Sequence, residues 1–536
     1  MSDTVSILWR LRRTAIWLGL LALIAGGAAG TAAGSSFPQS PGAATPSDGE
    51  RAGGLHLIIL HTNDLHGQVL PRPAFRAGVP NPPLAGGLVR IGGYVNQVRR
   101  EAAATSAELL VLDAGDWSQG TPEGAFHQGR DFLNALALVG YDAMCVGNHE
   151  FDHGVDVLEE SLSSVALPAV IANVRRADGT PVPGLPSHRV FNRGGMRIAV
   201  IGLISADTPR ITHPSAREWQ FAEPAAVLSE VRAQLAAEAD WVLPLTHLGV
   251  NGDRELARSH PDLDLIVGGH SHTLLPTGLV EGSTRIVQAG SKASAIGRVD
   301  VWFDVVEKRV VKLEARVVNL FREPQAEDQN HELRAECQAM LERGSEALDA
   351  TIGSLAAPML RADRRLTSSP AGNLICDAMR SATGAHVAIQ NRGGIRADLY
   401  AGVVTRRDLF NVLPFSNHLV VLHLSGRELE ACVRRAVEGA GRRGPEVSGM
   451  SLTLRRDGRN FQLAAITIDG RPLDPDGEYE LATNSFLATG GDGYEELVGA
   501  ERGDQPVTLL REVVGAVFAG GEPVTPPTEN RYVFVD

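Results

Sequence analysis

A series of short apolar runs between residues 55 and 290 constrains the fold of this chain more than any other feature. The runs are "LHLIIL", "ELLVLDAGD", "DAMCVGNHE", "MRIAVIGLIS", "WVLPLTHLG", "LDLIVGGHSH" and "STRIVQAGS", and nearly every one ends in a glycine or a polar residue. Segments with helical periodicity separate them. Buried strands that alternate with helices are typical of an α/β domain, which binds its ligands at the carboxyl ends of the strands. We therefore expect the polar strand ends of this chain to form a site.

The length of the chain and the changes in its composition predict two globular domains. At 536 residues the chain is too long for a single ordinary hydrophobic core. We expect the first α/β domain over 55–320 and a second α/β domain over 353–536. The charged segment between them has a helical period and predicts a linking helix over 321–352. Residues 35–54 are rich in Ser, Pro, Gly and Ala and predict a flexible linker.

The first residues have the pattern of a signal peptide. Arg10, Arg12 and Arg13 form a basic region, "AIWLGLLALI" is a short apolar core, and small residues follow. This core is about half as long as the ~20 residues of a spanning helix, although an uncleaved anchor remains the alternative. We expect residues 1–34 to direct export to the periplasm, the cell envelope or the medium, with no membrane span after cleavage.

Net charge and cysteine content exclude two classes of protein. The formal net charge of −13 argues against a protein that binds nucleic-acid polymers, because such proteins usually have a basic face. The four cysteines lack CxxC spacing, so a thiolate metal site is not expected, and whether any disulfide forms is left open. The sequence does not predict the oligomeric state.

Residues of the types that bind divalent cations follow five of the apolar runs. A single histidine at a strand end is more often part of a structural hydrogen bond than a metal ligand. The whole set in one chain predicts a dinuclear metal site. The residues concerned are Asp64, His66, Asp113, Asp116, Asn148, His149, Asp152, His247, His270 and His272.

The spacing of these residues suits metal binding. Residues i and i+2 of a strand face the same side, so Asp64 with His66, and likewise His270 with His272, can offer two ligands to one cavity. Nitrogen and oxygen ligands without thiolate suit Zn, Mn, Co or Fe. Asp116 is the natural bridge between two ions. Such a pair can activate water and hold the oxygens of a phosphoryl group during in-line attack.

The stretches "ILHTNDLHG", "GD", "GNHEFD", "TH" and "GGHSHT" resemble those of the calcineurin-like metallophosphoesterases. More narrowly, they are similar to the periplasmic and ecto-5'-nucleotidase family, which includes UDP-sugar hydrolases. The resemblance implies a four-layer α/β/β/α sandwich and two divalent ions (Zn, Mn, Co or similar). It implies that Asp116 binds both ions, that one ion is also held by Asp64, His66 and His272, and that the other is also held by Asn148, His247 and His270. Some members of the family have Gln or Asn in place of His272.

His149 and Asp152 have a different role in the proteins that this chain resembles. There they form a dyad beside the metals, in which the histidine stabilises charge on the phosphoryl oxygens or assists the leaving group. The aspartate orients the ring and favours its protonated form. The alternative for Asp152 is a surface position on a helix, and for Asp113 we favour a structural role.

The resemblance continues into the second domain through "AGNLICDAMR", "NRGGIRADL", "LPFSNHLV" and "NSFLATGGDGY". It implies that Phe415 and Phe486 stack on a nucleobase, a contact worth ~1–3 kcal/mol. Without the resemblance, a Phe in a Pro-Phe turn is more often part of the core. The resemblance assigns the base edge to Asn417, the ribose hydroxyls to Asp492, and the phosphate or ribose to the remaining set: Arg365, Asn391 and Arg396. "RADRRLTSS" offers several arginines besides Arg365, and the direction of the Arg392 side chain is left open.

These observations predict an exported hydrolase that releases phosphate from nucleoside 5'-phosphates, with di- and triphosphates and UDP-sugars as a wider range. Two enzyme alternatives share the metal domain: a 2',3'-cyclic-nucleotide phosphodiesterase/3'-nucleotidase and a thiosulfohydrolase. A non-catalytic nucleotide-binding surface protein is a further alternative, which is disfavoured because no expected ligand is missing. The family also implies that the second domain rotates to bring the nucleotide to the metals, with a hinge near 325–350.

Overall fold

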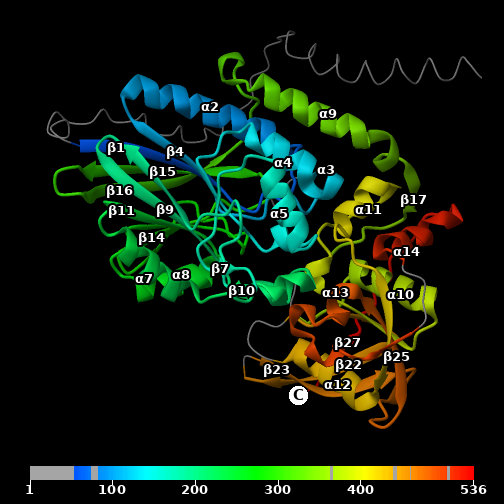
Figure 1. Cartoon of the computed structure of the whole chain (residues 1–536). Coiled ribbons are helices and arrows are strands. Elements are labelled where there is room, and N and C mark those ends of the chain that lie inside the picture. Colours follow the sequence, from blue (N-terminus) through cyan, green and yellow to red (C-terminus); the bar gives the residue numbers. More distant parts are fainter. Residues whose placement is uncertain are drawn as a thin grey trace, which may run out of the picture. The chain divides into compact units, whose positions relative to one another are not determined.

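The computed structural model describes residues 54–73, 83–362, 366–438, 443–458, 460–503 and 508–535 (Figure 1). The expected signal peptide over 1–34 lies outside these residues, and so does the expected linker except for its last residue. That residue, Gly54, is the first of strand β1. No helix within these ranges is both long and apolar enough to cross a bilayer.

The first domain contains two six-stranded sheets, and most of the neighbouring strands in their centres are parallel. The first sheet has the order β16 (Arg309–Asn319), β15 (Ala295–Asp304), β1 (Gly54–Thr62), β4 (Glu108–Asp113), β5 (Ala143–Cys145) and β6 (Ala169–Val170). The second has the order β13 (Leu279–Glu281), β14 (Thr284–Val287), β12 (Leu265–Gly268), β11 (Trp241–His247), β9 (Met196–Ile204) and β8 (His188–Arg193).

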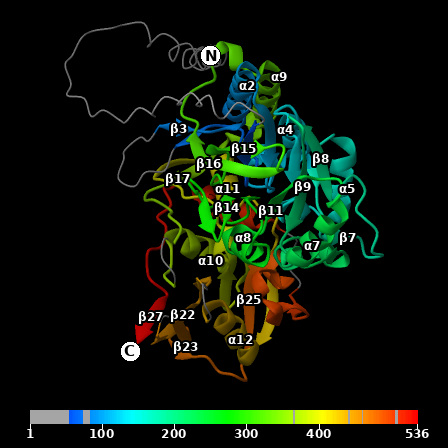
Figure 2. The same cartoon turned by 90° about the vertical axis from the view of Figure 1, so that its left-hand side faces the viewer.

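The two sheets are the inner layers of a four-layer α/β/β/α sandwich. In β1, Leu57 and Ile59 belong to the core between the sheets, whereas Ile58 and Leu60 belong to the core beneath the helices of the first sheet. Strands buried on both faces read as continuous apolar runs, which is the pattern seen in the sequence. The helices of the first sheet are α2 (Leu88–Thr105), α4 (Arg130–Ala137) and α5 (Val155–Ser164), and those of the second, visible in Figure 2, are α7 (Pro224–Leu235) and α8 (Gly249–Ser259). The expected fold class is confirmed.

The helix expected over 321–352 is shorter than that range. Helix α9 spans His331–Leu348, and the side chain of Asn330 caps its start by accepting a hydrogen bond from the Leu333 backbone. Pro324 also disfavours a helix over the preceding residues. The buried side chains of α9, among them Leu333 and Met340, belong to the core of the first domain, and α9 runs beside α2 in Figure 1. The helix is thus packed as a part of the first domain.

The second domain is built on a five-stranded and a four-stranded sheet. The first has the order β21 (Glu446–Ser448), β18 (Val387–Gln390), β25 (Glu478–Asn484), β20 (Leu419–Ser425) and β26 (Glu501–Arg502). The second has the order β24 (Arg471–Pro472), β23 (Asn460–Ile468), β22 (Met450–Asp457) and β27 (Tyr532–Val535). Their helices are α10 (Pro370–Thr383), α11 (Arg406–Val412), α12 (Gly426–Val437), α13 (Ser485–Ala488) and α14 (Leu510–Ala516). The two-stranded antiparallel sheet of β17 (Thr351–Leu355) and β19 (Gly402–Thr405) packs beside the turn that follows α14.

The remaining α-helices and strands are two four-residue helices and two pairs of two-residue strands. The helices are α3 (Pro122–Ala125) and α6 (Thr208–Ile211), and the strand pairs are β2 (Arg72–Pro73) with β3 (Leu84–Ala85) and β7 (Val174–Arg175) with β10 (Gln220–Phe221). All four cysteines, Cys145, Cys337, Cys376 and Cys432, are free and buried.

Candidate metal centre and substrate site

The candidate ligands of the first domain converge at the carboxyl ends of strands from both sheets. Three loops follow the neighbouring parallel strands β1, β4 and β5, and two follow β11 and β12 of the other sheet. Two groups of ligand atoms result, each with its members within 4.8 Å of one another. One group is Asp64, His66, Asp116 and His272, and the other is Asp116, His247 and His270. Asp116 belongs to both groups, as a bridging carboxylate would.

The backbone is left-handed at five of these ligands. The φ angles are 51° for Asp64, 50° for His66, 62° for Asp116, 76° for His270 and 55° for His272. Residues other than glycine rarely adopt this conformation, and each instance costs of the order of 1–3 kcal/mol. Each of these residues turns its chain sharply, just beyond the end of a strand. Backbone strain of this kind is concentrated at functional sites.

Two of the histidines are oriented so that one ring nitrogen is available to a cation. His66 Nδ1 donates to the carbonyl of Gln119 at 2.7 Å, and His247 Nδ1 donates to the carbonyl of Ala114 at 2.6 Å. The lone pair of each ring is therefore on Nε2. His66 Nε2 lies 2.8 Å from Nε2 of His272, and the buried His247 Nε2 lies 3.2 Å from Asp116 Oδ1. A backbone carbonyl behind a histidine is the usual support of a metal ligand, so these residues fit a cation.

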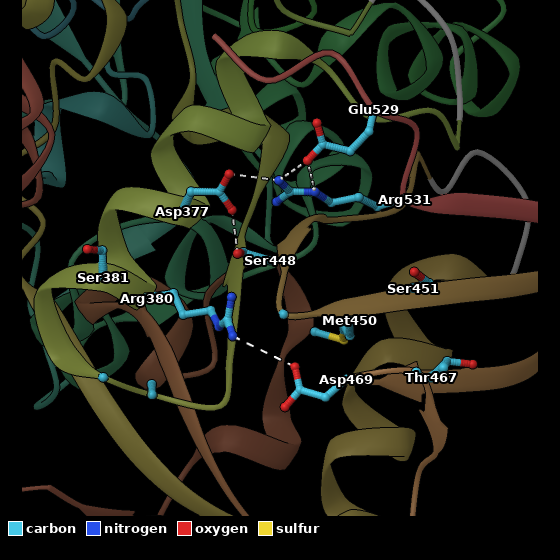
Figure 3. Close-up of a pocket in the computed structure, with 14 residues that line it drawn as sticks. Asp377, Arg380, Ser381, Ser448, Met450, Ser451, Thr467, Asp469, Glu529 and Arg531 are labelled. Atoms are coloured by element: carbon cyan, nitrogen blue, oxygen red, sulfur yellow. Dashed lines mark hydrogen bonds and ion pairs between the residues drawn. The ribbon is translucent and has the colours of Figure 1, made fainter. Parts of the chain in front are cut away.

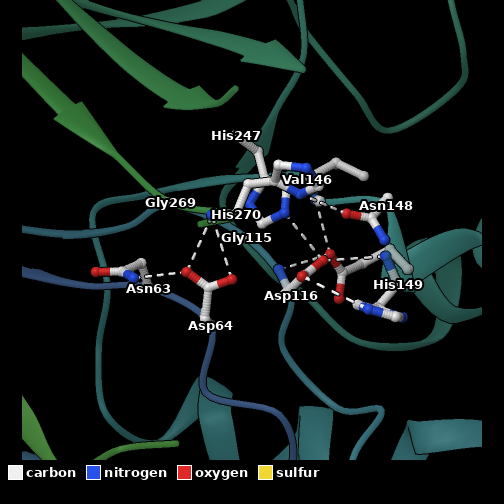
Figure 4. A network of polar contacts seen from close by, with 12 residues as sticks. Asn63, Asp64, Gly115, Asp116, Val146, Asn148, His149, His247, Gly269 and His270 are labelled. Carbon is white, nitrogen blue, oxygen red and sulfur yellow. Dashed lines mark hydrogen bonds and ion pairs between the residues drawn. The ribbon is translucent and has the colours of Figure 1, made fainter. Parts of the chain in front are cut away.

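The carboxylate of Asp64 is held by the backbone of His270 and by Asn63, a residue that the sequence motif did not identify as functional. Asn63 Nδ2 donates to Asp64 Oδ2 at 2.6 Å and to the Gly290 carbonyl at 2.6 Å. The backbone N–H of His270 donates to the same carboxylate at 3.0 and 3.2 Å (Figure 4). Asn63 thus joins the loop after β1 to the segment after β14.

Asn148 and His149 follow β5 and lie on the Asp116 side of the centre, as Figure 4 shows. Asn148 Oδ1 lies 2.9 Å from Nδ1 of His270, so the amide oxygen is beside the second group of ligand atoms. The backbone N–H of His149 donates to Asp116 Oδ1 at 3.0 Å, and its ring Nε2 lies 3.9 Å from Asp116 Oδ2.

His149 and Asp152 form a hydrogen-bonded dyad. His149 Nδ1 donates to Asp152 Oδ2 at 2.6 Å, and Thr212 Oγ1 donates to the other carboxylate oxygen at 3.1 Å. Burial by itself lowers the pKa of His149, but the carboxylates of Asp152 and Asp116 outweigh it and raise the pKa to about 9. With cations bound to Asp116, Asp152 is the carboxylate that still favours a protonated ring.

Glu150 is a residue of the site that the sequence analysis missed. Its carboxylate accepts hydrogen bonds from three backbone N–H groups: Asp116 at 2.9 Å, Trp117 at 2.7 Å and Gly147 at 2.7 Å. The residue therefore fastens the loop after β4 to the loop after β5. Its place inside the "GNHE" stretch was the only signal in the sequence.

Asp113 supports the loop after β4 and belongs to neither group of ligand atoms. It accepts hydrogen bonds from Thr62 Oγ1 at 2.6 Å and from the Gly115 backbone at 2.9 Å. Burial raises the pKa of this carboxyl to about 8. The structural role favoured from the sequence agrees with these contacts.

Two of the expected substrate-binding residues of the second domain lie against the metal centre. The ring of Phe415 stacks on that of His149, with centroids 5.6 Å apart and an angle of 20° between the planes. Burial lowers the pKa of the Arg396 guanidinium, and the carboxylates of Asp116, Asp64 and Asp152 act in the opposite direction. Gln119 Nε2 also donates to the Pro414 carbonyl at 3.2 Å. The "NRGGIR" and "LPFSNH" loops thus approach the metal site.

The other expected substrate residues form a second group. Asn391 Nδ2 donates to Asp492 Oδ2 at 2.7 Å, and Asn417 Oδ1 lies 3.5 Å from the Ser485 hydroxyl. The ring of Phe486 lies against Gly491, where a Cβ atom would be only 2.5 Å from the ring carbons. Among the described residues, Phe415 and Phe486 make no ring contact with each other. Arg365 lies outside the described residues.

The contacts of Arg392 are to residues of the second domain and favour the alternative in which its side chain points away from the metal centre. Its guanidinium donates to the Thr367 carbonyl, its Nε lies 3.4 Å from Glu446 Oε1, and it lies over the ring of Tyr532 at 5.9 Å.

A separate hollow of about 790 Å³ lies between α10 and the strands β21 and β22 of the second domain (Figure 3). Its charged groups are paired with one another. Arg531 Nη2 lies 2.8 Å from Asp377 and 2.5 Å from Glu529, and Arg380 lies 3.9 Å from Asp469. These pairs leave little unmet charge for a ligand, so the metal centre remains the candidate site.

The fold and the metal centre define the class of protein. The family model of the calcineurin-like phosphoesterases matches residues 57–274, and that of the 5'-nucleotidase C-terminal domain matches residues 351–499. The first model covers the loops that carry the metal-ligand candidates. The second covers the loops of the expected substrate pocket.

Relatives of known sequence or structure narrow this class. The chain is 30% identical over 489 residues to the protein UshA of Yersinia enterocolitica, a match of 82% of this chain and 86% of that one. The crystal structure of a 5'-nucleotidase precursor from Thermus thermophilus superposes with a TM-score of 0.79 at 28% identity, over 90% of this chain and 100% of the other. The sulfate thiohydrolase SoxB of Thermus thermophilus shares the fold, with a TM-score of 0.76 at 21% identity over 92% and 98% of the chains. The chain belongs to the 5'-nucleotidase family of metallophosphoesterases and is a phosphoester hydrolase.

Proposed function

We propose that this chain is a two-metal 5'-nucleotidase, which hydrolyses nucleoside 5'-monophosphates to nucleoside and phosphate. The observation that carries the proposal is the pair of ligand groups that share Asp116, with the His149–Asp152 dyad beside them. The loops of the second domain that bear Arg396 and Phe415 approach the same place. A phosphate and the nucleoside attached to it would contact both domains.

The ligands would divide between two divalent ions. Asp64, His66 and His272 would hold one, Asn148, His247 and His270 the other, and Asp116 both. The ions would polarise the phosphoryl oxygens and lower the pKa of water. The nitrogen and oxygen ligands fit Zn, Mn, Co and Fe, so the identity of the metal is a matter for measurement.

The side chains around the ions would act on the phosphoryl group. His149, held by Asp152 with its Nε2 toward Asp116, would donate a proton or hydrogen bond to an oxygen that gains charge. Arg396 would neutralise charge on the phosphate. In a protein with a net charge of −13, this local cation matters, because the long-range field does not attract an anionic substrate.

The nucleoside would be bound by the second domain. Phe415 and Phe486 would stack on the base, and Asn417 would bond its edge. Asn391 and Asp492, already joined by a hydrogen bond, would meet the ribose, and Arg365 would contribute to the phosphate or ribose. One face of the Phe415 ring is stacked on His149, so a base between the two phenylalanines would stack on the other face or displace that contact.

We further propose that the protein is exported and acts in the periplasm, at the cell envelope or outside the cell. The support is the sequence pattern of residues 1–34. N-terminal sequencing of the mature protein, with fractionation of the cells that produce it, tests this proposal. A cytoplasmic protein that retains its first residues would refute it.

Phosphate release by the purified mature chain tests the proposed activity, with added Mn or Zn. The substrates are AMP, ATP, UDP-glucose, 3'-AMP, 2',3'-cyclic AMP and bis-p-nitrophenyl phosphate, each with the wild type and with His149→Ala. We expect AMP to be preferred, and the variant to lose about 10²–10⁴-fold in kcat with unchanged metal content.

The other outcomes select the alternatives. Preference for 2',3'-cyclic AMP and 3'-AMP would assign the chain to the cyclic phosphodiesterases. Activity on the generic diester alone would retain the metal site and reject the nucleotide pocket. Full activity of His149→Ala would reject the dyad.

A further inference from the structure

The loop after β12 carries two metal-ligand candidates in a strained conformation. His270 and His272 have φ angles of 76° and 55°, and the segment between β12 and these residues packs tightly. A Cβ atom on Gly269 would lie 2.6 Å from the Ala114 carbonyl and 3.0 Å from His247 Nδ1. Something must stabilise this conformation, because the cost of such residues is met by their surroundings.

The side chain of Gln288 binds this loop on both sides of the two histidines. Gln288 directly follows β14 and is fully buried. Its Nε2 donates to the Gly269 carbonyl at 2.9 Å. Its Oε1 accepts from the Ser271 hydroxyl at 2.9 Å and from the Thr273 backbone at 3.3 Å.

The second N–H of the Gln288 amide is taken by Asp253 on α8. Gln288 Nε2 donates to Asp253 Oδ2 at 3.3 Å, and Asp253 Oδ1 accepts from Thr246 Oγ1 at 2.6 Å. Thr246 immediately precedes His247 in β11. Asp253 is also fully buried, and it lies so close to Gly268 that a Cβ there would be 2.1 Å from its carboxylate. The network thus joins the segment of His247 to the loop of His270 and His272.

We propose that Gln288, oriented by Asp253, is a positioning residue that sets the loop conformation in which His270 and His272 present their rings to the metal centre. The inference rests on the metal site of the proposed function. Neither Gln288 nor Asp253 is a candidate ligand, and each acts through hydrogen bonds to the segments that carry the ligands.

The chemistry of the amide makes Gln288 difficult to replace. A glutamine side chain has two N–H donors and one oxygen with two lone pairs, and the four hydrogen bonds use all of them. A glutamate has nearly the same shape but lacks both donors. It would place an oxygen against the Gly269 carbonyl and a second carboxylate beside Asp253. Loss of the groups that support metal ligands typically costs about 10–100-fold in metal affinity.

The test compares Gln288→Glu with a matched variant of another buried amide in the same domain. Asn173 Nδ2 donates to the carbonyls of Ile204 at 2.7 Å and Ala222 at 2.9 Å, so Asn173→Asp makes the same chemical change away from the loop. Metal-free protein is titrated with Mn²⁺ and with Co²⁺, whose visible absorption reports the ligand geometry. We expect Gln288→Glu to raise the Kd of at least one ion about 10–100-fold and to change the cobalt spectrum. Asn173→Asp should stay within about twofold of the wild type, and the KM for nucleotide should be unchanged in both variants.

Each other outcome decides the question. An unchanged metal affinity and cobalt spectrum in Gln288→Glu would overturn the positioning role and leave the proposed function intact. A wild type that binds neither ion would overturn both. If Gln288→Glu does not fold, Gln288→Met keeps the volume without adding charge, and wild-type metal affinity in that variant would overturn the proposal. A pair of changes, Gln288→Glu with Asp253→Asn, again places one amide beside one carboxylate, and we expect it to recover part of the lost affinity.

Discussion

At the scale of single residues, the site depends on side chains whose hydrogen bonds fix a single orientation. Each ligand histidine that donates Nδ1 to a carbonyl must offer Nε2 to the centre. Glu150 accepts hydrogen bonds from three backbone N–H groups of the ligand loops, and Gln288 makes three of its four hydrogen bonds to the loop of His270 and His272. The fourth goes to Asp253 of α8. The precision of the ligands therefore comes from residues that bind no metal themselves.

In the second domain, the position of the Phe486 ring depends on the absence of a side chain at Gly491. A Cβ atom at this position would lie 2.5 Å from the ring of Phe486, so Gly491→Ala must displace the ring. We expect the KM for AMP to rise about tenfold, in keeping with the ~1–3 kcal/mol of a stacking contact, and kcat/KM for p-nitrophenyl phosphate to stay unchanged. Steady-state kinetics on both substrates measure this difference.

Gly520→Ala is the matched control, because nothing lies within 4 Å of the Cβ position at Gly520. It should leave both kinetic constants at the wild-type values. An equal loss on AMP and on p-nitrophenyl phosphate in Gly491→Ala would contradict a role of Phe486 in base binding.

At the scale of elements, the first sheet is joined to α2 by an ionic network on β15. Arg298 donates to Glu101 of α2 at 2.6 and 2.7 Å and to Asp300 at 2.9 Å. Asp300 also accepts from Arg316 of β16 at 2.9 Å and from His56 of β1 at 3.0 Å. One carboxylate therefore connects three neighbouring strands.

This network predicts a loss of stability in acid. Burial tends to raise the pKa of Asp300, but the hydrogen bonds and charges of His56, Arg298 and Arg316 hold it well below its usual range. The stabilisation is therefore complete above the pKa of ~3.9 of an unfolded aspartate, and it is lost as the pH falls further. We expect Asp300→Asn to lower the free energy of unfolding at pH 7 by about 2 kcal/mol.

Urea unfolding at a series of pH values checks this prediction. The difference between the wild type and Asp300→Asn should be constant from about pH 7 to 5 and should narrow as the pH falls through 4 to 3. A difference that stays the same down to pH 3 would show that the charge of Asp300 does not stabilise the fold.

At the scale of the whole described chain, the site combines groups from two domains. Besides the stacking of Phe415 on His149, Arg217 of the first domain donates to the Thr489 carbonyl of the second at 2.6 Å. Because α9 is packed into the first domain, the residues after Leu348 are the connection at which a rotation would occur. A hinge, expected from the sequence near 325–350, would therefore lie at the end of that range, after Leu348.

A cross-link between the domains tests whether their movement limits turnover. All four native cysteines are buried, so cysteines introduced at Arg217 and Thr489 can be joined selectively by a reducible linker. We expect kcat for AMP to fall at least tenfold in the linked protein and to recover on reduction, because lid and domain opening limit many enzymes of this kind. The two single-cysteine variants are the controls, and an unchanged kcat in the linked protein would show that no such movement is needed.

The amino-acid sequence by itself determined the fold class and the chemical character of the site. Strands buried on both faces must be continuously apolar, and ligands at their carboxyl ends must appear as polar residues directly after each run. No single one of these residues indicated a metal site, but the set did: Asp64, His66, Asp116, His247, His270 and His272. The motifs of the second domain predict a nucleotide-type pocket through their resemblance to the 5'-nucleotidases.

The tertiary structure alone decided how these residues are supported and which neighbours they meet. Asn63 binds the Gly290 carbonyl, which is 227 residues away and follows a strand of the other sheet, whereas Glu150 and Gln288 bind loops of neighbouring strands in their own sheets. Such partners depend on the order and packing of the strands rather than on local spacing. The direction of Arg392 and the docking of α9 have the same origin. A hydrogen bond needs its atoms within about 3 Å, and only the packed layers bring together groups that are so distant in sequence.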